Sequence, residues 1–276
     1  MLKQRIATAA VMLAVFLSAL FLLPTSLFAA PVAAVVAAGA YEWAVLVGVR
    51  GAAGLVFSGT CAGLFAATIW GWQAVDPSHT GLVVVYALAS VFWILVVPFW
   101  LSRGFTIRSK ALALAIGLVV VVPAGLSVVS FHSIAPQTLL MLLVLIWGAD
   151  TSAYFIGRAF GRHKLAPAIS PGKTWEGVAG AQVATLVYAV ACVVISPSLQ
   201  TMVQGGNWAP FLGVASLLCA ISIVGDLFES LIKRQAMVKD SGTLLPGHGG
   251  VLDRIDSITS TVPVAALLFY VLAGGA

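Results

Sequence analysis

Long apolar runs separated by short polar breaks make up most of the chain. A helix that crosses the hydrocarbon of a membrane needs about 20 mostly apolar residues, and the breaks divide the sequence into nine such runs. Only Pro24, Thr25 and Ser26 separate the first two runs, so eight or ten spans also fit the pattern. The expected spans are residues 6–23, 26–48, 52–73, 81–100, 111–130, 134–157, 175–197, 209–232 and 257–275. The pattern therefore predicts an all-α polytopic membrane protein with about nine transmembrane helices.

The composition supports a membrane protein and excludes other classes. Of the 276 residues, 61% are hydrophobic and 8% are charged, whereas soluble domains carry roughly 25% charged residues. So few charges cannot cover the surface of a soluble globule, and a disordered chain would be poorer in apolar residues. The three cysteines lie within apolar runs without a paired spacing, so they indicate neither a zinc site nor disulfides.

The positive charges predict the orientation in the membrane. Lys and Arg accumulate in the short cytoplasmic loops of membrane proteins. With nine spans and a cytoplasmic N terminus, all 14 Lys and Arg residues fall on one side. We therefore predict a multi-pass protein of the plasma membrane, of bacterial inner-membrane type, with the N terminus inside and the C terminus outside. The net charge of +5 then reflects topology and not nucleic-acid binding.

The first 30 residues allow an alternative. Lys3 and Arg5 precede an apolar run that ends near Ala29 and Ala30, which is a weak signal-peptide pattern. Cleavage there would leave the rest of the predicted topology unchanged.

Polar residues are concentrated in the second half of the chain. Residues 1–149 hold eight charged residues, whereas residues 150–256 hold 15, including seven of the nine acids. No internal repeat is visible. We predict one membrane domain, residues 1–276, in which 1–149 are mainly scaffold and 150–276 supply catalytic helices and cytoplasmic loops.

A first polar group closes the sixth span. If the helix continues, Asp150, Tyr154 and Arg158 lie four residues apart on one face. They form either a structural ion pair at the membrane edge or one wall of a substrate cavity.

A second polar group precedes the seventh span. Ser170 before Pro171 is typical of a helix N-cap, and a helix N terminus binds anions readily. With Lys173 in the first turn, and Arg162 and Lys164 nearby, this segment would suit phosphate. A P-loop is excluded because its first glycine would fall at Pro167 and no strand precedes it. The alternative is a positively charged cytoplasmic loop followed by a capped helix.

A third polar group lies inside the eighth span. Asp226, Glu229, Ser230 and Lys233 occupy positions i, i+3, i+4 and i+7, so they form one stripe on a helix. An ionised side chain near the bilayer centre costs about 3 kcal/mol. The stripe therefore predicts a polar cavity or a bound cation.

The loop after this stripe carries a second pair of acids. Glycines at 247, 249 and 250 allow close approach of the backbone to a ligand, and Asp253 and Asp256 follow just before the ninth span. Two carboxylate clusters can thus converge, and hard oxygen ligands of this kind suit Mg²⁺. His248 is compatible with such a site. The alternative is an interhelical network of salt bridges.

These segments resemble a known family. The run Ser230 to Asp256 is similar to the signature of phosphatidate cytidylyltransferases, also called CDP-diacylglycerol synthases, and Asp150 to Gly177 is similar to their other shared block. The shared positions of the signature are Ser230, Lys233, Arg234, Lys239, Asp240, Gly242, Leu245, Pro246, His248, Gly249, Gly250, Asp253, Arg254 and Asp256. Ala181 departs from the pattern, where a glycine is expected.

The resemblance implies that CTP and phosphatidic acid give CDP-diacylglycerol and pyrophosphate at a site open to the cytoplasm. It also implies a requirement for Mg²⁺, in some members with K⁺ beside it, membrane lipid as the surroundings, and often a homodimer. The aspartates that resemble the family's cation ligands are Asp226 and Asp253.

We predict in-line attack of the lipid phosphate on the α-phosphorus of CTP. The expected catalytic residues are Lys173, Lys233, Arg234, Lys239, Asp240, His248, Arg254 and Asp256. The expected substrate-phosphate ligands are Ser170, Lys173, Arg158, Arg162, Lys164 and Ser230, and the expected metal ligands are Asp226 and Asp253.

Two other functions fit parts of the pattern. One is an ion-coupled transporter that uses Asp150, Asp226 and Glu229 as a cation relay. The other is a transferase that uses a different nucleotide or a polyprenyl phosphate.

Overall fold

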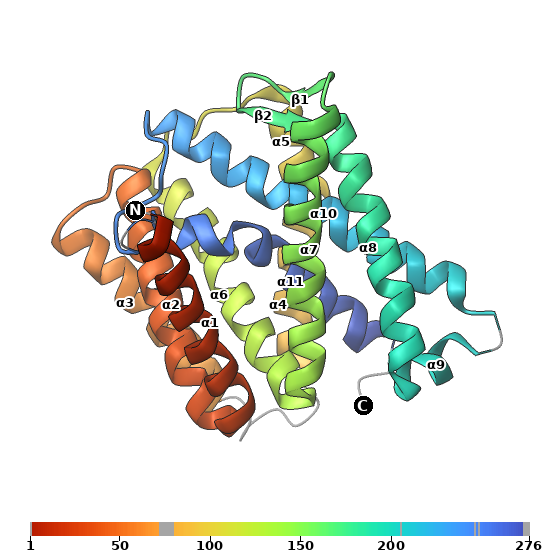
Figure 1. The fold of residues 1–276 in the computed structure, drawn as a ribbon. Helices are drawn as coiled ribbons and strands as arrows, with labels where there is room; N and C mark the ends of the chain where they lie inside the picture. Colours follow the sequence, from red (N-terminus) through yellow and green to blue (C-terminus); the bar gives the residue numbers. More distant parts are fainter. Residues whose placement is uncertain (1, 72–79, 205, 246, 248, 273–276) are drawn as a thin grey trace.

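The computed structural model describes residues 2–71, 80–204, 206–245, 247 and 249–272. These residues form a bundle of long helices with one small hairpin at its end (Figure 1). The first half contains α1 (Leu2–Leu22), α2 (Thr25–Leu46), α3 (Ala52–Ala66), η1 (Ala67–Gly71), α4 (Thr80–Val91), η3 (Phe92–Val96), α5 (Val97–Arg103) and α6 (Lys110–Ile134). The second half contains α7 (Pro136–Phe160), β1 (Lys164–Ala166), β2 (Ser170–Thr174), α8 (Trp175–Ile195), α9 (Pro197–Val203), α10 (Trp208–Gln235) and α11 (Leu252–Leu272).

The helices agree with the predicted all-α membrane class. Within the described residues, eight helical segments are long and apolar enough to cross a membrane. They coincide with the second to ninth predicted spans. The first predicted span overlaps α1, of which Leu13–Leu22 counts as a shorter apolar helix, so the count of nine stays a prediction, as does the orientation.

One predicted boundary is wrong in a way that affects the site. The ninth span was expected to begin at 257, but α11 begins at Leu252. Asp253 and Asp256 therefore lie in the first two turns of a helix and not in the loop before it. The reason is local: the carboxylate of Asp253 lies in the first turn of the helix, where negative charge is favourable.

The second prediction that is wrong concerns the start of α8. Ser170 is not an N-cap, because residues 170–174 form strand β2, which pairs antiparallel with β1. Thr174 is the N-cap instead, and its Oγ1 accepts a hydrogen bond from the Gly177 amide at 3.2 Å. Lys173 thus lies in a strand that precedes the helix. The hairpin is the one small exception to an all-α fold in the described chain.

An aromatic cluster holds the centre of the bundle. The ring of Phe228 on α10 lies within 6.2 Å, centroid to centroid, of the rings of Trp43, Phe92, Trp93 and Trp100. These rings come from α2, η3 and α5, so the cluster joins the first half of the chain to the helix that carries the polar stripe.

The outer helices present apolar side chains. On α8, Val183, Val187, Val194 and Ile195 are 62–80% exposed. Exposed aliphatic side chains on a long apolar helix are expected where lipid is the solvent. On its inner face, Ala181 packs with Ala149 and Cys219, so the alanine that departs from the family pattern is a buried packing residue.

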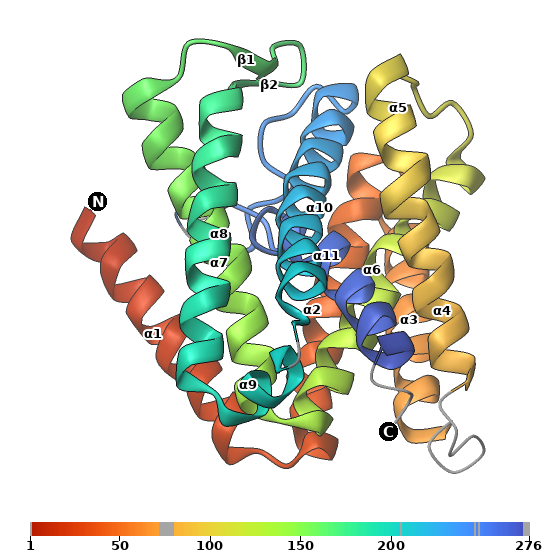
Figure 2. The same cartoon turned by 90° about the vertical axis from the view of Figure 1, so that its right-hand side faces the viewer.

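Several basic loops gather at one end of the bundle. The hairpin and the C-terminal ends of α5 and α10 lie together, whereas α9 lies at the opposite end (Figures 1 and 2). This arrangement agrees with the sorting of Lys and Arg to one side. The polar stripe of α10 runs toward that same end.

Candidate active site

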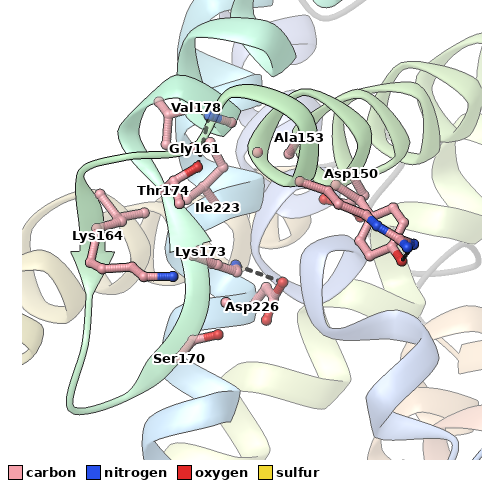
Figure 3. A pocket seen from close by; sticks show the side chains of 16 residues that line it. Asp150, Ala153, Gly161, Lys164, Ser170, Lys173, Thr174, Val178, Ile223 and Asp226 are labelled. Atoms are coloured by element: carbon pink, nitrogen blue, oxygen red, sulfur yellow. Dashed lines mark hydrogen bonds and ion pairs between the residues drawn. The ribbon is translucent and has the colours of Figure 1, made fainter.

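A cavity of about 600 Å³ opens where α7, the hairpin, α8 and α10 meet. Its walls combine charged side chains with glycines (Figure 3). The lining residues are Asp150, Ala153, Tyr154, Gly157, Arg158, Gly161, Lys164, Leu165, Ser170, Gly172, Lys173, Thr174, Gly177, Val178, Ile223 and Asp226. All of them belong to the half of the chain that was predicted to carry the chemistry.

The α7 wall confirms the predicted helical face. Because α7 continues without a break to Phe160, Asp150, Tyr154 and Arg158 all line the cavity. The Arg158 guanidinium donates to the Tyr154 hydroxyl at 3.1 Å. This face is therefore a wall of the cavity, with an acid deep in the helix and a base toward its end.

The hairpin supplies the opposite wall. Lys164, Ser170 and Lys173, which were predicted to bind substrate phosphate, line the cavity. Their binding of phosphate stays a prediction. The Lys173 ammonium lies 2.6 Å from the Asp226 carboxylate on α10, and Figure 3 shows the side chain crossing between the two elements. With side-chain exposures of 23% and 29%, this pair is accessible to a ligand in the cavity.

Close backbone contact makes this junction possible. Gly157 on α7 and Gly177 on α8 face each other, and a Cβ on Gly177 would lie 2.8 Å from the carbonyl oxygen of Ala153. Any larger residue would push α8 away from α7. The two glycines therefore set the position of Thr174, and with it the position of the hairpin.

The polar stripe on α10 is also confirmed. Ser230 donates to Asp226 at 3.3 Å, and the Lys233 ammonium lies 3.4 Å from Glu229. The same ammonium lies 2.7 Å from Asp253 on α11. The two carboxylate clusters thus converge, joined by a lysine that is only 10% exposed.

Asp253 lies at the centre of a dense set of contacts. Its Oδ2 accepts from the Ser241 amide, the Ser241 hydroxyl and the Gly250 amide at 2.8–3.0 Å, and its Oδ1 accepts from Lys233. The side chain is 8% exposed and is not part of the cavity wall. Gly249 has φ +84°, a conformation that suits glycine, beside the Asp253 carboxylate.

Three acids lie within electrostatic reach of one another near the cavity. Asp256 interacts with both Asp226 and Asp150, and Asp150 interacts with Asp226. Lys173 is the ammonium in direct contact with this group, through Asp226. Repulsion among neighbouring carboxylates is relieved either by a cation beside them or by protonation of one of them.

The Asp226 carboxylate suits Mg²⁺, whereas the Asp253 carboxylate is already occupied by hydrogen-bond donors. Mg²⁺ usually takes one or two carboxylates and completes its shell with waters and substrate phosphates, and Asp226 presents a carboxylate to the cavity. Among the described residues, no three His, Cys, Asp or Glu side chains form a metal site by themselves. Asp253 already has four donors, so a ligand role for it requires that Lys233 leave Oδ1.

The remaining predicted residues take other positions. Arg162 is exposed and does not line the cavity, while Arg234 donates to the backbone carbonyls of Ile169 and Val238 and so fastens the hairpin to α10. Lys239 and Asp240 are exposed in the loop after α10, and Arg254 lies in the first turn of α11. The prediction for His248 lies outside the described residues.

One buried acid was missed by the sequence reasoning. Glu42 belongs to α2, in the half that was predicted to be scaffold, yet it is 3% exposed and accepts hydrogen bonds from Ser241, Val251 and Leu252. Its signal was available, since an acid inside an apolar span is costly unless it has partners.

The chain is similar to known proteins over its whole length. Residues 3–272 match the profile of the cytidylyltransferase family. A phosphatidate cytidylyltransferase from Pseudomonas aeruginosa is 42% identical over 283 aligned positions that cover 100% of both chains. One from Haemophilus influenzae is 36% identical and covers 98% of this chain and 99% of its own length.

A third relative matches over part of its length. A phosphatidate cytidylyltransferase from Bacillus subtilis is 42% identical over 130 residues, which are 47% of this chain and 45% of the relative.

Proposed function

The chain belongs to the cytidylyltransferase family and is a nucleotidyltransferase, and we propose that it transfers the cytidylyl group of CTP to phosphatidic acid. A phosphate oxygen of the lipid attacks the α-phosphorus of CTP in line. The bond from that phosphorus to the bridging oxygen breaks, and pyrophosphate leaves. The products are CDP-diacylglycerol and pyrophosphate, and no covalent enzyme intermediate is needed.

The Lys173–Asp226 pair in the cavity carries this proposal. Catalysis of transfer at phosphorus depends mainly on positioning and on neutralisation of charge. Lys164, Lys173 and Arg158 surround the cavity and would neutralise phosphate oxygens, while Ser170 would donate to one of them. An anion near Lys173 would compete with Asp226 for the ammonium, so that the pair opens as the substrate binds.

The cation belongs to the same proposal. Asp226 and Asp253 would hold Mg²⁺, with K⁺ as a second cation, and the metal would supply charge neutralisation for the phosphates of both substrates. The protein's own part is to keep the Asp226 carboxylate directed into the cavity, which Ser230 does by its hydrogen bond. Lys233 pairs with Oδ1 of Asp253 in the structure, so that pair has to open before Asp253 can take part.

The location in the membrane follows from the two substrates. Phosphatidate keeps its acyl chains in lipid and its phosphate at the surface, and CTP arrives from water. A cavity between apolar helices at the basic end of the bundle suits both substrates. We propose that this end faces the cytoplasm of the bacterial inner membrane.

The direct test is conversion of labelled CTP into chloroform-soluble product by detergent-purified protein, with and without phosphatidate and Mg²⁺. Asp226→Asn and Asp253→Asn are assayed beside it, each checked for folding by size-exclusion chromatography. We expect label to enter the lipid fraction only when phosphatidate, Mg²⁺ and both aspartates are present. Near-native turnover in either variant would contradict the assignment of the cation ligands. If folded protein made no labelled lipid, the proposed reaction would be refuted and the ion-coupled transporter would be favoured.

A further inference from the structure

Glu42 is the one acid of α2, and the loop that leads into α11 closes on it. Its Oε1 accepts from the Val251 amide at 2.9 Å, and its Oε2 accepts from the Leu252 amide at 2.9 Å. These amides precede or open α11, where backbone N–H groups have no partner within the helix. The side chain lies 210 residues before Leu252 in the chain, so the contact is purely tertiary.

The loop backbone is shaped around this carboxylate. A Cβ on Gly242 or on Gly250 would lie 2.5 Å from a carboxylate oxygen of Glu42. Only glycine lets the backbone approach an oxygen this closely. Glu42 therefore occupies the interior of the loop.

Ser241 links Glu42 to Asp253. Its hydroxyl lies 2.9 Å from Oε2 of Glu42 and 3.0 Å from Oδ2 of Asp253. A serine hydroxyl has a single hydrogen, so the two carboxylates share one donor. Ser241 is 5% exposed, and water has little access to replace it.

From these contacts we propose that Glu42 is a positioning residue of the active site, which holds Ser241, Val251 and Leu252 at the two ends of the loop before α11 and, through Ser241, orients the Asp253 carboxylate. The proposal rests on the proposed function for its effect on turnover. Groups that orient a metal ligand typically cost 10- to 100-fold in affinity or activity when they are lost. The half of the chain that was expected to be scaffold would thus contribute a residue that controls the site.

The carboxylate itself is required, because both oxygens accept backbone N–H groups. In Glu42→Gln, either orientation of the amide directs an NH₂ group at a backbone amide, so one hydrogen bond becomes a repulsion. Glu42→Asp keeps two acceptor oxygens on a side chain that is shorter by one methylene. We expect Glu42→Gln to lower kcat about 10- to 100-fold with the KM for CTP unchanged, and Glu42→Asp to recover part of that loss.

A second measurement separates positioning from general destabilisation. Hydrogen–deuterium exchange in detergent should increase in the peptide spanning 241–254 of Glu42→Gln, with exchange in α2 and α3 unchanged. Ser58→Ala is the matched control, because it removes a hydrogen bond from α3 to the Ala37 carbonyl of α2 without touching the loop. It should lower the melting temperature without changing exchange at 241–254.

A double-mutant cycle tests the route through Ser241. If Glu42 acts on Asp253 through that hydroxyl, Glu42→Gln combined with Ser241→Ala should lower kcat no further than the worse single variant. Multiplied losses, or wild-type kcat in Glu42→Gln, would overturn the proposal. If the wild-type protein itself makes no labelled lipid, the proposed function fails, and the exchange measurement alone then decides whether Glu42 holds the loop.

Discussion

The Lys233 ammonium bridges two buried carboxylates, and its removal should destabilise the protein strongly. Its Nζ lies 2.7 Å from Asp253 and 3.4 Å from Glu229, and the three side chains are 7–10% exposed. Removing one partner of a buried pair typically costs about 3–5 kcal/mol. Asp253 would keep three hydrogen bonds, whereas neither oxygen of Glu229 has a hydrogen-bond partner. Most of the cost should therefore arise at Glu229.

The assay is thermal unfolding of Lys233→Met in detergent, followed with a thiol-reactive dye. Cys61 and Cys219 are both buried, so the dye reports their exposure. A decrease of about 3–5 kcal/mol in the free energy of unfolding corresponds to a decrease in melting temperature on the order of 10 °C. Arg234→Met is the matched control, since Arg234 is exposed and contacts backbone carbonyls, and it should change the melting temperature much less.

A second variant tests where the cost arises. Lys233→Met combined with Glu229→Gln removes the carboxylate that lacks hydrogen bonds, and it should recover a large part of the lost stability. Wild-type stability in Lys233→Met, or no recovery in the double variant, would refute the reasoning.

Three further outcomes follow from the structure. Lys173→Ala should lower kcat/KM for CTP by about 10- to 100-fold, the loss of one hydrogen bond to a charged group; unchanged steady-state kinetics would contradict its role at the phosphates. Gly117→Ala should destabilise by about 1–3 kcal/mol because a Cβ there meets the Trp43 indole, whereas Gly59→Ala, with nothing within 4 Å, should not; equal melting temperatures would contradict this packing. The cysteine of Lys239→Cys should react with an impermeant reagent only from the cytoplasmic side of oriented vesicles, and labelling from the outside would contradict the predicted orientation.

Local patterns were sufficient where the relevant partners lie within a few turns. The stripe from Asp226 to Lys233 follows from helix periodicity alone, and so does the common face of Asp150 and Arg158. Apolar run length likewise predicts where most helices begin and end, since lipid requires about the same length from each.

Local patterns failed where two nearby residues compete for one role. Ser170 and Thr174 are both good N-caps by type, and the choice depends on the hairpin that the intervening residues form with β1. The strands are three and five residues long, too short for a clear alternation. The helix therefore begins four residues later than the cap motif indicated, and Lys173 reaches Asp226 from a strand.

The sequence by itself determined the membrane class, the family and the segments that hold the chemistry, because these depend on composition, periodicity and short motifs. Only the tertiary structure decided which groups meet. Glu42 contacts Ser241 across 199 residues, and Lys233 joins two helices. The physical reason is that a buried charge must find partners wherever the fold brings them, and the spacing of residues along one helix carries no information about the helix packed against it.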